Sequence, residues 1–443
     1  MRSRRLSQSN ENKVLDLDKR VRMRRLSNGM KAIICENRHV SQSYAIAMFK
    51  AGSRYESVAD NGLTHVLEHM VFRGAGRYKD SRALNEAAED IGGMLEAATY
   101  RDLVTFSTAA HRTNVEEAIR ILASLMTGPK YQHLETEKEI ICEEVLESLD
   151  AKGRMIDVDN LSHRIIFDGH SLAKPIEGSL SNVKSFAHRD LKRYQERLFT
   201  AANGIVAISV SKYDKGLWQL IEDAFGGLPQ GEALVSDTPL MDNSSRYRHV
   251  RHTGSQVEFR LSYRGIAPQD PDYPAMVLLN RILGEGMSSR LQSELIDGMG
   301  LAYSLFASST TYSDCATYDF DCSVAPGKFL SCFEELVNFA NRATRARYSE
   351  AEIERARRRH LYAIEFMGDS PADMTSWYGR HHLYDLPGTL ASLQNDLETV
   401  SAADLRRVAR RLFKEGPAWG VSVGPLDKAT KERAEALAEE LLN

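Results

Sequence analysis

The residues with the clearest chemical potential in this 443-residue chain are two histidines and a glutamate, in the segment His65-Val-Leu-Glu68-His69. On a helix, residues four apart lie on the same face, so both imidazoles can reach one metal ion. Glu68 lies close enough to act on a water molecule bound to that ion. Asp60 and Asn61, just upstream, can cap such a helix. Polar histidines at a helix surface also show this spacing, so the segment alone does not establish a metal site.

A catalytic zinc needs a third protein ligand and keeps its fourth position for water. Candidates come from the acid-rich segment 137–144, within a stretch predicted to be helical. Glu137 and Glu144 are about two helical turns apart, so they share a face. Acid-rich helices are most often solvated surfaces, so this segment gains meaning only together with the histidines. The combination predicts a site of two histidines and one carboxylate.

The elements that must position these residues include two copies of one pattern. Residues 190–199 resemble residues 404–413, with six of the ten positions identical and an offset of 214. A β-type run follows each copy, at 204–210 and at 419–423. Two amphipathic helices could converge on one pattern, but the shared context on both sides favours an internal duplication.

The duplication predicts two domains, an N-terminal catalytic domain at 20–228 and a C-terminal homologous domain at 246–443. A shift of the two histidines by 214 residues falls on Leu279 and Leu283, so the second domain is expected to lack metal ligands. In each half, predicted strands come first and helices follow, which is typical of an α+β fold. An Asn-Gly turn at 28–29 predicts a hairpin at the start.

Composition limits the remaining function classes. The chain has 57 Lys+Arg against 61 Asp+Glu, without the strongly basic domain of a nucleic-acid-binding protein. No run approaches the roughly 18 apolar residues needed to span a membrane. The arginine- and serine-containing start faintly resembles a mitochondrial presequence, but Glu11 and Asp16 favour a cytosolic arm. We therefore expect a cytoplasmic protein with no nucleic-acid or membrane partner.

With these motifs in place, the chain resembles the pitrilysin family of inverted-zincin metallopeptidases. It is similar to the shorter two-domain subunits of that family, of the mitochondrial processing peptidase β type. The resemblance rests on the segment 62–74, on Gly300-Leu-Ala-Tyr-Ser304 and on the 74 residues between His69 and Glu144. It implies two homologous α/β-sandwich domains, each a mixed or antiparallel sheet with helices packed on it.

The resemblance also implies roles for individual residues. It assigns His65, His69 and Glu144 as ligands of one Zn²⁺ ion. It makes Glu68 the general base and Glu137 the carboxylate that supports the site. Tyr303 would stabilise the oxyanion from a facing subunit. The implied activity is that of a zinc metalloendopeptidase acting on peptides or unfolded segments.

Two positions depart from the family pattern. Family members that complete the active site carry an arginine seven residues before the tyrosine, where this chain has Ile296. We therefore expect a heterodimer with a second pitrilysin-like subunit that carries the Arg–Tyr pair, although Tyr303 could also be an ordinary strand tyrosine. Glu96 stands where family chains usually have asparagine, in a segment resembling the substrate-binding edge strand. A non-catalytic core subunit and a self-sufficient homodimeric peptidase are the alternatives.

Overall fold

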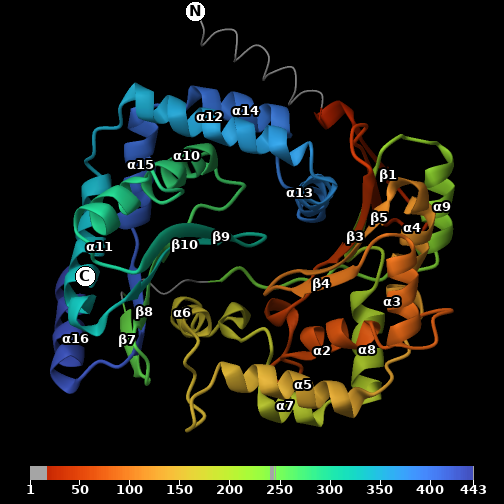
Figure 1. Cartoon of the computed structure of the whole chain (residues 1–443), viewed down its shortest axis with the longest axis horizontal. Helices are drawn as coiled ribbons and strands as arrows, with labels where there is room; N and C mark the ends of the chain where they lie inside the picture. The colour runs from red at the N-terminus through yellow and green to blue at the C-terminus, as the bar shows by residue number, and fades with distance from the viewer. Residues whose placement is uncertain (1–16, 240–243, 245, 443) are drawn as a thin grey trace, which may run out of the picture. The chain divides into compact units, whose positions relative to one another are not determined.

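The predicted hairpin at Asn28 and Gly29 begins the first β-sheet of the protein, and Gly29 has the positive φ that such a turn requires. The computed structural model describes residues 17–239, 244 and 246–442 (Figure 1). The N-terminal arm, residues 1–16, lies outside this range. None of the described helices is both long and apolar enough to cross a bilayer.

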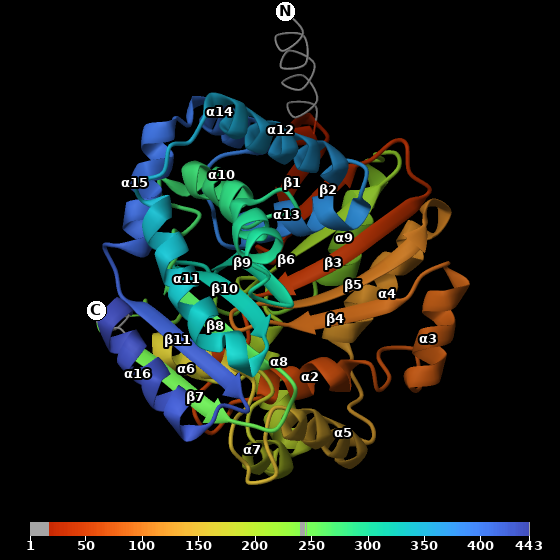
Figure 2. The ribbon, with the colours of Figure 1, turned by 60° about the vertical axis from the view of Figure 1, so that its left-hand side comes forward.

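The first sheet has the strand order β1-β2-β6-β3-β5-β4. Only β2 and β6 pair in parallel among its described neighbours, so the sheet is mixed, as expected. Strand β6 is buried along its whole length and lies in the interior of the sheet, whereas β4 lies at its edge (Figure 2). The strands are β1 (Val21–Arg25), β2 (Lys31–Glu36), β3 (Gln42–Phe49), β4 (Leu95–Thr99), β5 (Val104–His111) and β6 (Gly204–Val210).

Helices cover both faces of this sheet. Alternate side chains of β6 point to opposite faces, so they pack into two different cores. Val206 and Ile208 belong to a core with the helices that follow the strands in the first half of the sequence. Ile205 and Ala207 instead pack against α13 (Pro371–Leu383), which comes from the second half (Figure 1). The helices that contribute to this core are α2 (Leu63–Val71), α3 (Ser81–Asp90), α4 (Val115–Thr127), α5 (Leu134–Glu147), α7 (Leu180–Ser185), α8 (His188–Leu198) and α9 (Gly216–Phe225).

The second sheet repeats the first with one strand fewer, in the order β7-β11-β8-β10-β9. Its parallel pair, β7 and β11, corresponds to β2 and β6, and the other described pairs are antiparallel. This shared topology agrees with the predicted duplication. The strands are β7 (Arg246–Arg251), β8 (Val257–Arg264), β9 (Ser304–Thr311), β10 (Ala316–Val324) and β11 (Ala418–Gly424).

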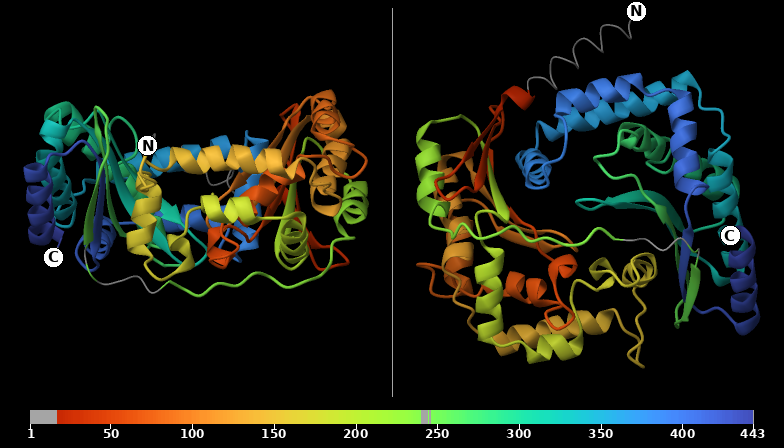
Figure 3. Two further views of the ribbon diagram at one scale, coloured as in Figure 1. Left: turned by 90° about the horizontal axis from the view of Figure 1, so that it is seen from below. Right: turned by 180° about the vertical axis from the view of Figure 1, so that it is seen from behind.

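Helices again cover both faces of the second sheet (Figure 3). On one face, Val257 and Phe259 share a core with α10, α11, α15 and α16. On the other, Trp419 and Val421 pack with α6, which comes from the first half of the sequence. A π-helix, η4, follows α10. These elements are α6 (Val158–Ile166), α10 (Tyr273–Leu283), η4 (Gln292–Gly298), α11 (Phe329–Ala343), α12 (Glu350–Met367), α14 (Leu390–Thr399), α15 (Ala402–Phe413) and α16 (Lys428–Leu442).

The chain therefore forms two compact units that are not continuous in sequence. The first unit contains the residues up to Glu147, Lys174–Asp237 and Tyr362–Ala391. The second contains Ser148–Ala173, Thr238–Leu361 and Ser392–Asn443. The sequence predicted continuous ranges, and the units differ from them in two segments. The segment that carries α6 belongs to the second unit, and the segment that carries α13 belongs to the first. The physical reason is that each segment buries its apolar side chains on the sheet built mainly by the other half.

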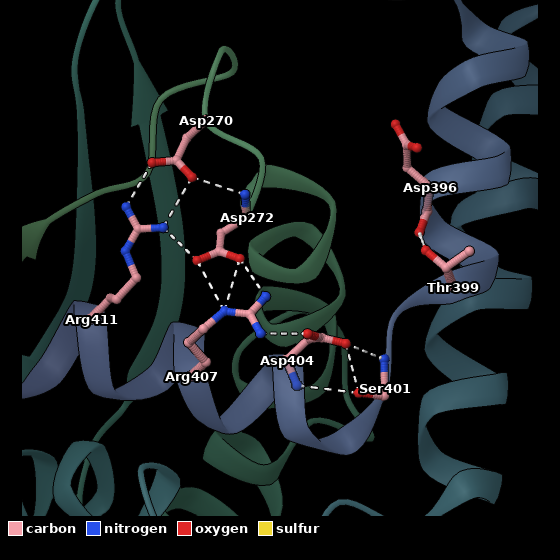
Figure 4. Close-up of polar contacts among 8 residues, drawn as sticks. All are labelled: Asp270, Asp272, Asp396, Thr399, Ser401, Asp404, Arg407 and Arg411. Atoms are coloured by element: carbon pink, nitrogen blue, oxygen red, sulfur yellow. Dashed lines mark hydrogen bonds and ion pairs between the residues drawn. The ribbon is translucent and has the colours of Figure 1, made fainter.

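The duplicated segment proves to be helix α8 in the first unit and helix α15 in the second. Each holds the start of a neighbouring helix through an arginine. Arg193 of α8 contacts Asp60 at 2.7 Å, and Arg407 of α15 contacts Asp272 at 2.5 Å. Figure 4 shows the second cluster, in which Arg411 also reaches Asp272. The same ion pair therefore occurs at equivalent places in both units, although surface pairs of this kind stabilise only weakly.

Candidate metal centre

Helix α2 presents the two predicted histidines on one face. The ring centroids of His65 and His69 lie 4.7 Å apart, in an edge-on arrangement. The apolar residues of the helix, among them Val66, Leu67 and Met70, are fully buried. Packing of that opposite stripe therefore fixes the rotation of the helix, and with it the direction of the imidazoles.

The start of α2 is held by a carboxylate that the sequence patterns did not identify. Glu56, which is buried, accepts hydrogen bonds from the backbone N–H groups of Gly62 and Thr64 at 2.9 and 2.7 Å. It also accepts from the Thr64 hydroxyl and the Asn61 amide. The expected capping by Asp60 or Asn61 is therefore wrong, because Gly62 is the N-cap residue and has no side chain.

Gly62 is required at this position by space as well as by conformation. Its φ of +97° lies in the left-handed region, and a Cβ there would come within 2.6 Å of the Glu177 carbonyl oxygen. The chain segment around Glu177 thus packs directly against the start of the helix that carries the histidines.

Helix α5 brings the two predicted glutamates to the same place. Its buried residues recur at helical spacing, and Glu137 occupies one of these inward positions with its side chain only 3% exposed. Oε2 of Glu144 lies 3.6 Å from Nε2 of His65 and 3.9 Å from Nε2 of His69. One candidate ligand atom from each of these three residues lies within 4.8 Å of the others. In the part of the chain that the structure describes, this is the only such group of three or more.

These residues fit a zinc ion. A tetrahedral zinc with bonds of about 2.0–2.1 Å separates its ligand atoms by roughly 3.4 Å, close to the two distances from Glu144. Two imidazoles and one carboxylate are a donor set found in catalytic zinc sites. Burial, with a smaller effect of His69, lowers the pKa of His65 to about 4. His65 is therefore neutral at physiological pH, which is the form that binds a metal.

Glu137 orients one of the histidines. Its Oε2 lies 3.2 Å from Nδ1 of His69, while its Oε1 forms an ion pair with Arg73. A proton on Nδ1 that is donated to Glu137 leaves the lone pair of Nε2 facing Glu144. Carboxylates that hold metal-binding histidines in this way fix both the tautomer and the ring orientation.

Glu68 lies beside the same group and is held from the sheet. The hydroxyl of Thr99, the last residue of β4, donates a 2.8 Å hydrogen bond to Oε2 of Glu68. Burial raises the pKa of Glu68, and this effect exceeds the opposing one of the Thr99 hydrogen bond. Thr99 thus links the edge strand to the carboxylate, and neither Thr99 nor Arg73 carried a signal in the sequence.

The other predicted positions do not belong to this cluster. Tyr303 lies in the second unit, just before β9, and its side chain is 86% exposed. Ile296 lies in η4 and packs against the second core. Leu279 and Leu283 of α10 are fully buried, so apolar packing replaces the histidines in the duplicate. Glu96 is exposed on β4.

Comparison with known proteins identifies the family of the chain. Residues 32–179 match the family described as "Insulinase (Peptidase family M16)", and residues 185–359 match "Peptidase M16 inactive domain". Together the two matches cover more than half of the chain.

Individual relatives are distant but span nearly the whole chain. A probable mitochondrial-processing peptidase subunit beta from Arabidopsis thaliana is 26% identical over 420 residues, which are 91% of this chain and 78% of the relative. The uncharacterized zinc protease YmxG of Bacillus subtilis is 25% identical over 395 residues, 88% of this chain and 94% of the relative.

The fold is shared with solved structures. The crystal structure of a protease from Helicobacter pylori superimposes with a TM-score of 0.83 at 20% identity, over 91% of this chain and 99% of that one. The expected family resemblance and the α+β fold of two similar domains are thereby confirmed. The chain belongs to peptidase family M16.

Proposed function

We propose that this protein is a zinc-dependent metalloendopeptidase that cleaves peptides or unfolded segments. The observation that carries the proposal is the convergence of His65, His69 and Glu144, with a buried Glu68 beside them. The names of relatives such as the zinc protease of Bacillus subtilis support the same chemistry. Zn²⁺ is the proposed cofactor, with those three residues as its ligands.

The chemistry follows from the positions of the protein groups. When bound, zinc supplies a Lewis acid that acidifies water and polarises the substrate carbonyl. Glu68 accepts the proton of the attacking water and then delivers it to the nitrogen of the leaving amine. Thr99 holds the Glu68 carboxylate during both transfers, because its hydroxyl donates to one oxygen and leaves the other available. Glu137 keeps His69 in its metal-binding tautomer.

We further propose that the substrate binds as an extended strand along β4. This strand is at the edge of the first sheet, and its last residue contacts the proposed general base. An unpaired strand edge offers backbone groups that can pair with any extended peptide. Glu96 and Thr99 are three positions apart, so their side chains point to opposite faces of the strand. Glu96 is therefore proposed to affect substrate preference and not the chemical step.

A second subunit is part of the proposal. Ile296 cannot donate a hydrogen bond to a substrate, and it is packed into a core. Tyr303 is exposed and can therefore contact another chain. We propose that it stabilises an oxyanion that forms in the active site of the facing subunit. Several relatives are named as beta subunits, which supports a heterodimer with a similar chain that carries the Arg–Tyr pair. A self-sufficient homodimer is the alternative.

A cytoplasmic location is also proposed. The bacterial relatives named as zinc proteases are compatible with it, whereas the relatives named as mitochondrial leave an organelle as the alternative outcome. Fractionation of the source cells with an antibody against the chain distinguishes the two.

The zinc assignment is tested with the purified full chain. About one zinc per chain is expected by elemental analysis, and less than about 0.2 after mild purification would contradict a catalytic site. Glu68→Gln should keep the zinc and lose cleavage of a quenched fluorescent peptide. Glu139→Gln, an exposed glutamate on α5, is the matched control and should keep both. Cleavage by Glu68→Gln at the wild-type rate would remove Glu68 as the base.

The partner is tested separately. The zinc-loaded chain alone should turn over a mixed peptide library slowly, and a second family subunit with the Arg–Tyr pair should increase the rate. A normal rate from the chain alone would refute the heterodimer, and sedimentation would then show whether the active form is a homodimer.

A further inference from the structure

Strands β1, β2, β6 and β3 of the first sheet each have one end at the same edge of the sheet. None of these strands carries a proposed metal ligand. Strand β1 is antiparallel to β2, β2 is parallel to β6, and β6 is antiparallel to β3. The last residue of β1, Arg25, is therefore paired with the first residue of β2, Lys31. In the same way Phe49, the last residue of β3, is paired with Gly204 at the start of β6. Lys50 follows Phe49 at this end of the sheet.

A cavity of about 330 Å³ lies among these strand ends, and we call it the sheet-end pocket. Its volume falls at the lower end of the range of small-molecule sites. Apolar atoms of alanines and of Leu383 form part of its wall. The polar side chains that line it are Arg25, Asn28, Lys31, Lys50, Gln230 and Asp385.

The charges around the sheet-end pocket do not cancel. Three of its side chains are cations and one is an anion, which leaves two positive charges around one small volume. Lys31 already has partners, since its ammonium donates to the His382 carbonyl at 2.7 Å and to Asp385 at 2.5 Å. Arg25 uses one nitrogen on the Gly29 carbonyl and keeps its other donors.

Of the three cations, Lys50 is the one without a partner among the described residues. Its side chain is half-buried, yet no described residue lies within hydrogen-bond or ion-pair distance of its ammonium. Burial and the neighbouring Lys31 lower the pKa of Lys50, against the opposing effect of Asp385. The backbone of Lys50 is fixed, because its N–H donates to the Asn203 carbonyl and its carbonyl accepts from the Asn203 amide. A partly desolvated ammonium held in this way costs stability unless a negative group accompanies it.

We propose that the sheet-end pocket binds a small ligand through a phosphate or carboxylate group, which pairs with Lys50 and Arg25. Either oxyanion supplies acceptors for a lysine and for the planar fork of an arginine. The amides of Asn28 and Gln230 and the apolar wall would contact the rest of the ligand. The site is independent of the proposed peptidase chemistry, since it shares no residue with the metal centre.

Thermal unfolding of the full chain tests the proposal, because the effect of Lys50→Met on the melting temperature should change sign when the anion is added. The probes are inorganic phosphate and succinate, each compared with sodium chloride at equal ionic strength. We expect at least one of them to raise the melting temperature of the wild type in a saturable manner, with one site per chain by calorimetric titration. Lys50→Met should melt at or above the wild-type temperature in chloride, because it removes a half-buried charge that has no partner among the described residues. In the saturating anion the same variant should melt below the wild type.

Two further variants make the result specific. Arg25→Gln, at an exposed side chain, should weaken anion binding several-fold, and Lys50→Met should weaken it at least tenfold. Lys192→Met removes an exposed lysine of α8 that likewise has no hydrogen-bond or ion-pair partner among the described residues, and it should bind like the wild type. A preference for phosphate assigns a phosphate-bearing ligand, and a preference for succinate assigns a carboxylate. The proposal is wrong if neither anion saturates, or if Lys50→Met binds as tightly as the wild type.

Discussion

The substitution Glu137→Gln tests the proposed metal centre most directly, because it keeps the shape of the side chain and removes one acceptor. The carboxylate presents two oxygens to two donors, Nδ1 of His69 and the guanidinium of Arg73. A carboxamide has one oxygen and one NH₂ group, so it cannot present a separate oxygen to each donor. The charged Arg73 should retain the oxygen, which leaves the NH₂ group facing His69.

The expected loss can be worked from that single contact. A hydrogen bond to a charged acceptor contributes about 1.5–3 kcal/mol and a neutral one about 0.5–1.5. Loss of the bond from His69 Nδ1 to Glu137, with the tautomer no longer fixed, should therefore weaken zinc binding by about 10- to 100-fold. This corresponds to about 1.4–2.7 kcal/mol of binding free energy.

The assay is a competitive titration of the metal-free chain against a chromogenic zinc chelator. Glu139→Gln, an exposed glutamate of the same helix, is the control and should bind zinc like the wild type. Arg73→Met combined with Glu137→Gln frees the carboxamide oxygen to turn toward His69, so the penalty of the glutamine should be smaller in that background. Equal affinity of Glu137→Gln and the wild type would refute the orienting role, and an equal penalty with and without Arg73 would refute the competition for one oxygen.

Three further outcomes are expected from substitutions elsewhere in the chain. Glu56→Gln should lower the free energy of unfolding by about 3 kcal/mol in urea titrations, because a single amide oxygen replaces the two carboxylate oxygens that cap α2. A decrease of less than about 0.5 kcal/mol would contradict this. Burial raises the pKa of Asp319 to about 6, from 3.8, so the protonated form favours folding. Wild-type stability should then fall by about 2 kcal/mol between pH 4 and pH 7 relative to Asp319→Asn, and parallel pH profiles would exclude this. Hydrogen bonds from Arg407 and Arg411 lower the pKa of Asp272, so its stabilisation is present at pH 7 and is lost as the pH falls below about 4. Asp272→Asn should accordingly be less stable than the wild type at neutral pH, with the difference narrowing in acid.

Much of the candidate metal centre could be predicted because its determinants are local. The spacing of His65 and His69 places them on one face of any helix, and Glu137 and Glu144 share a face of another. The same holds for strand β6 and its copy β11, whose continuous apolar runs predict buried strands. These features depend on the periodicity of residue types within about ten residues, and this periodicity can be read directly from the sequence.

The contacts that complete the centre could not be predicted in this way. Glu56 caps α2 from outside the usual capping position, and Thr99 reaches Glu68 from a strand whose pairing with β5 aims the hydroxyl. The expected cap at Asp60 failed because that carboxylate pairs with Arg193 of α8. Each of these contacts joins segments that have no periodic relation to one another.

The sequence by itself determined that two similar halves exist and that only the first carries the candidate metal ligands. It did so because the repeat and the replacement of both histidines by leucines can be read from residue types alone. The tertiary structure decided which segments build each unit, through the packing of α13 on the first sheet and of α6 on the second. It also decided that the ammonium of Lys50, at the end of the first sheet, has no hydrogen-bond or ion-pair partner among the described residues. Both outcomes depend on burial among residues far apart in the chain, and that burial is settled only when the sheets are formed.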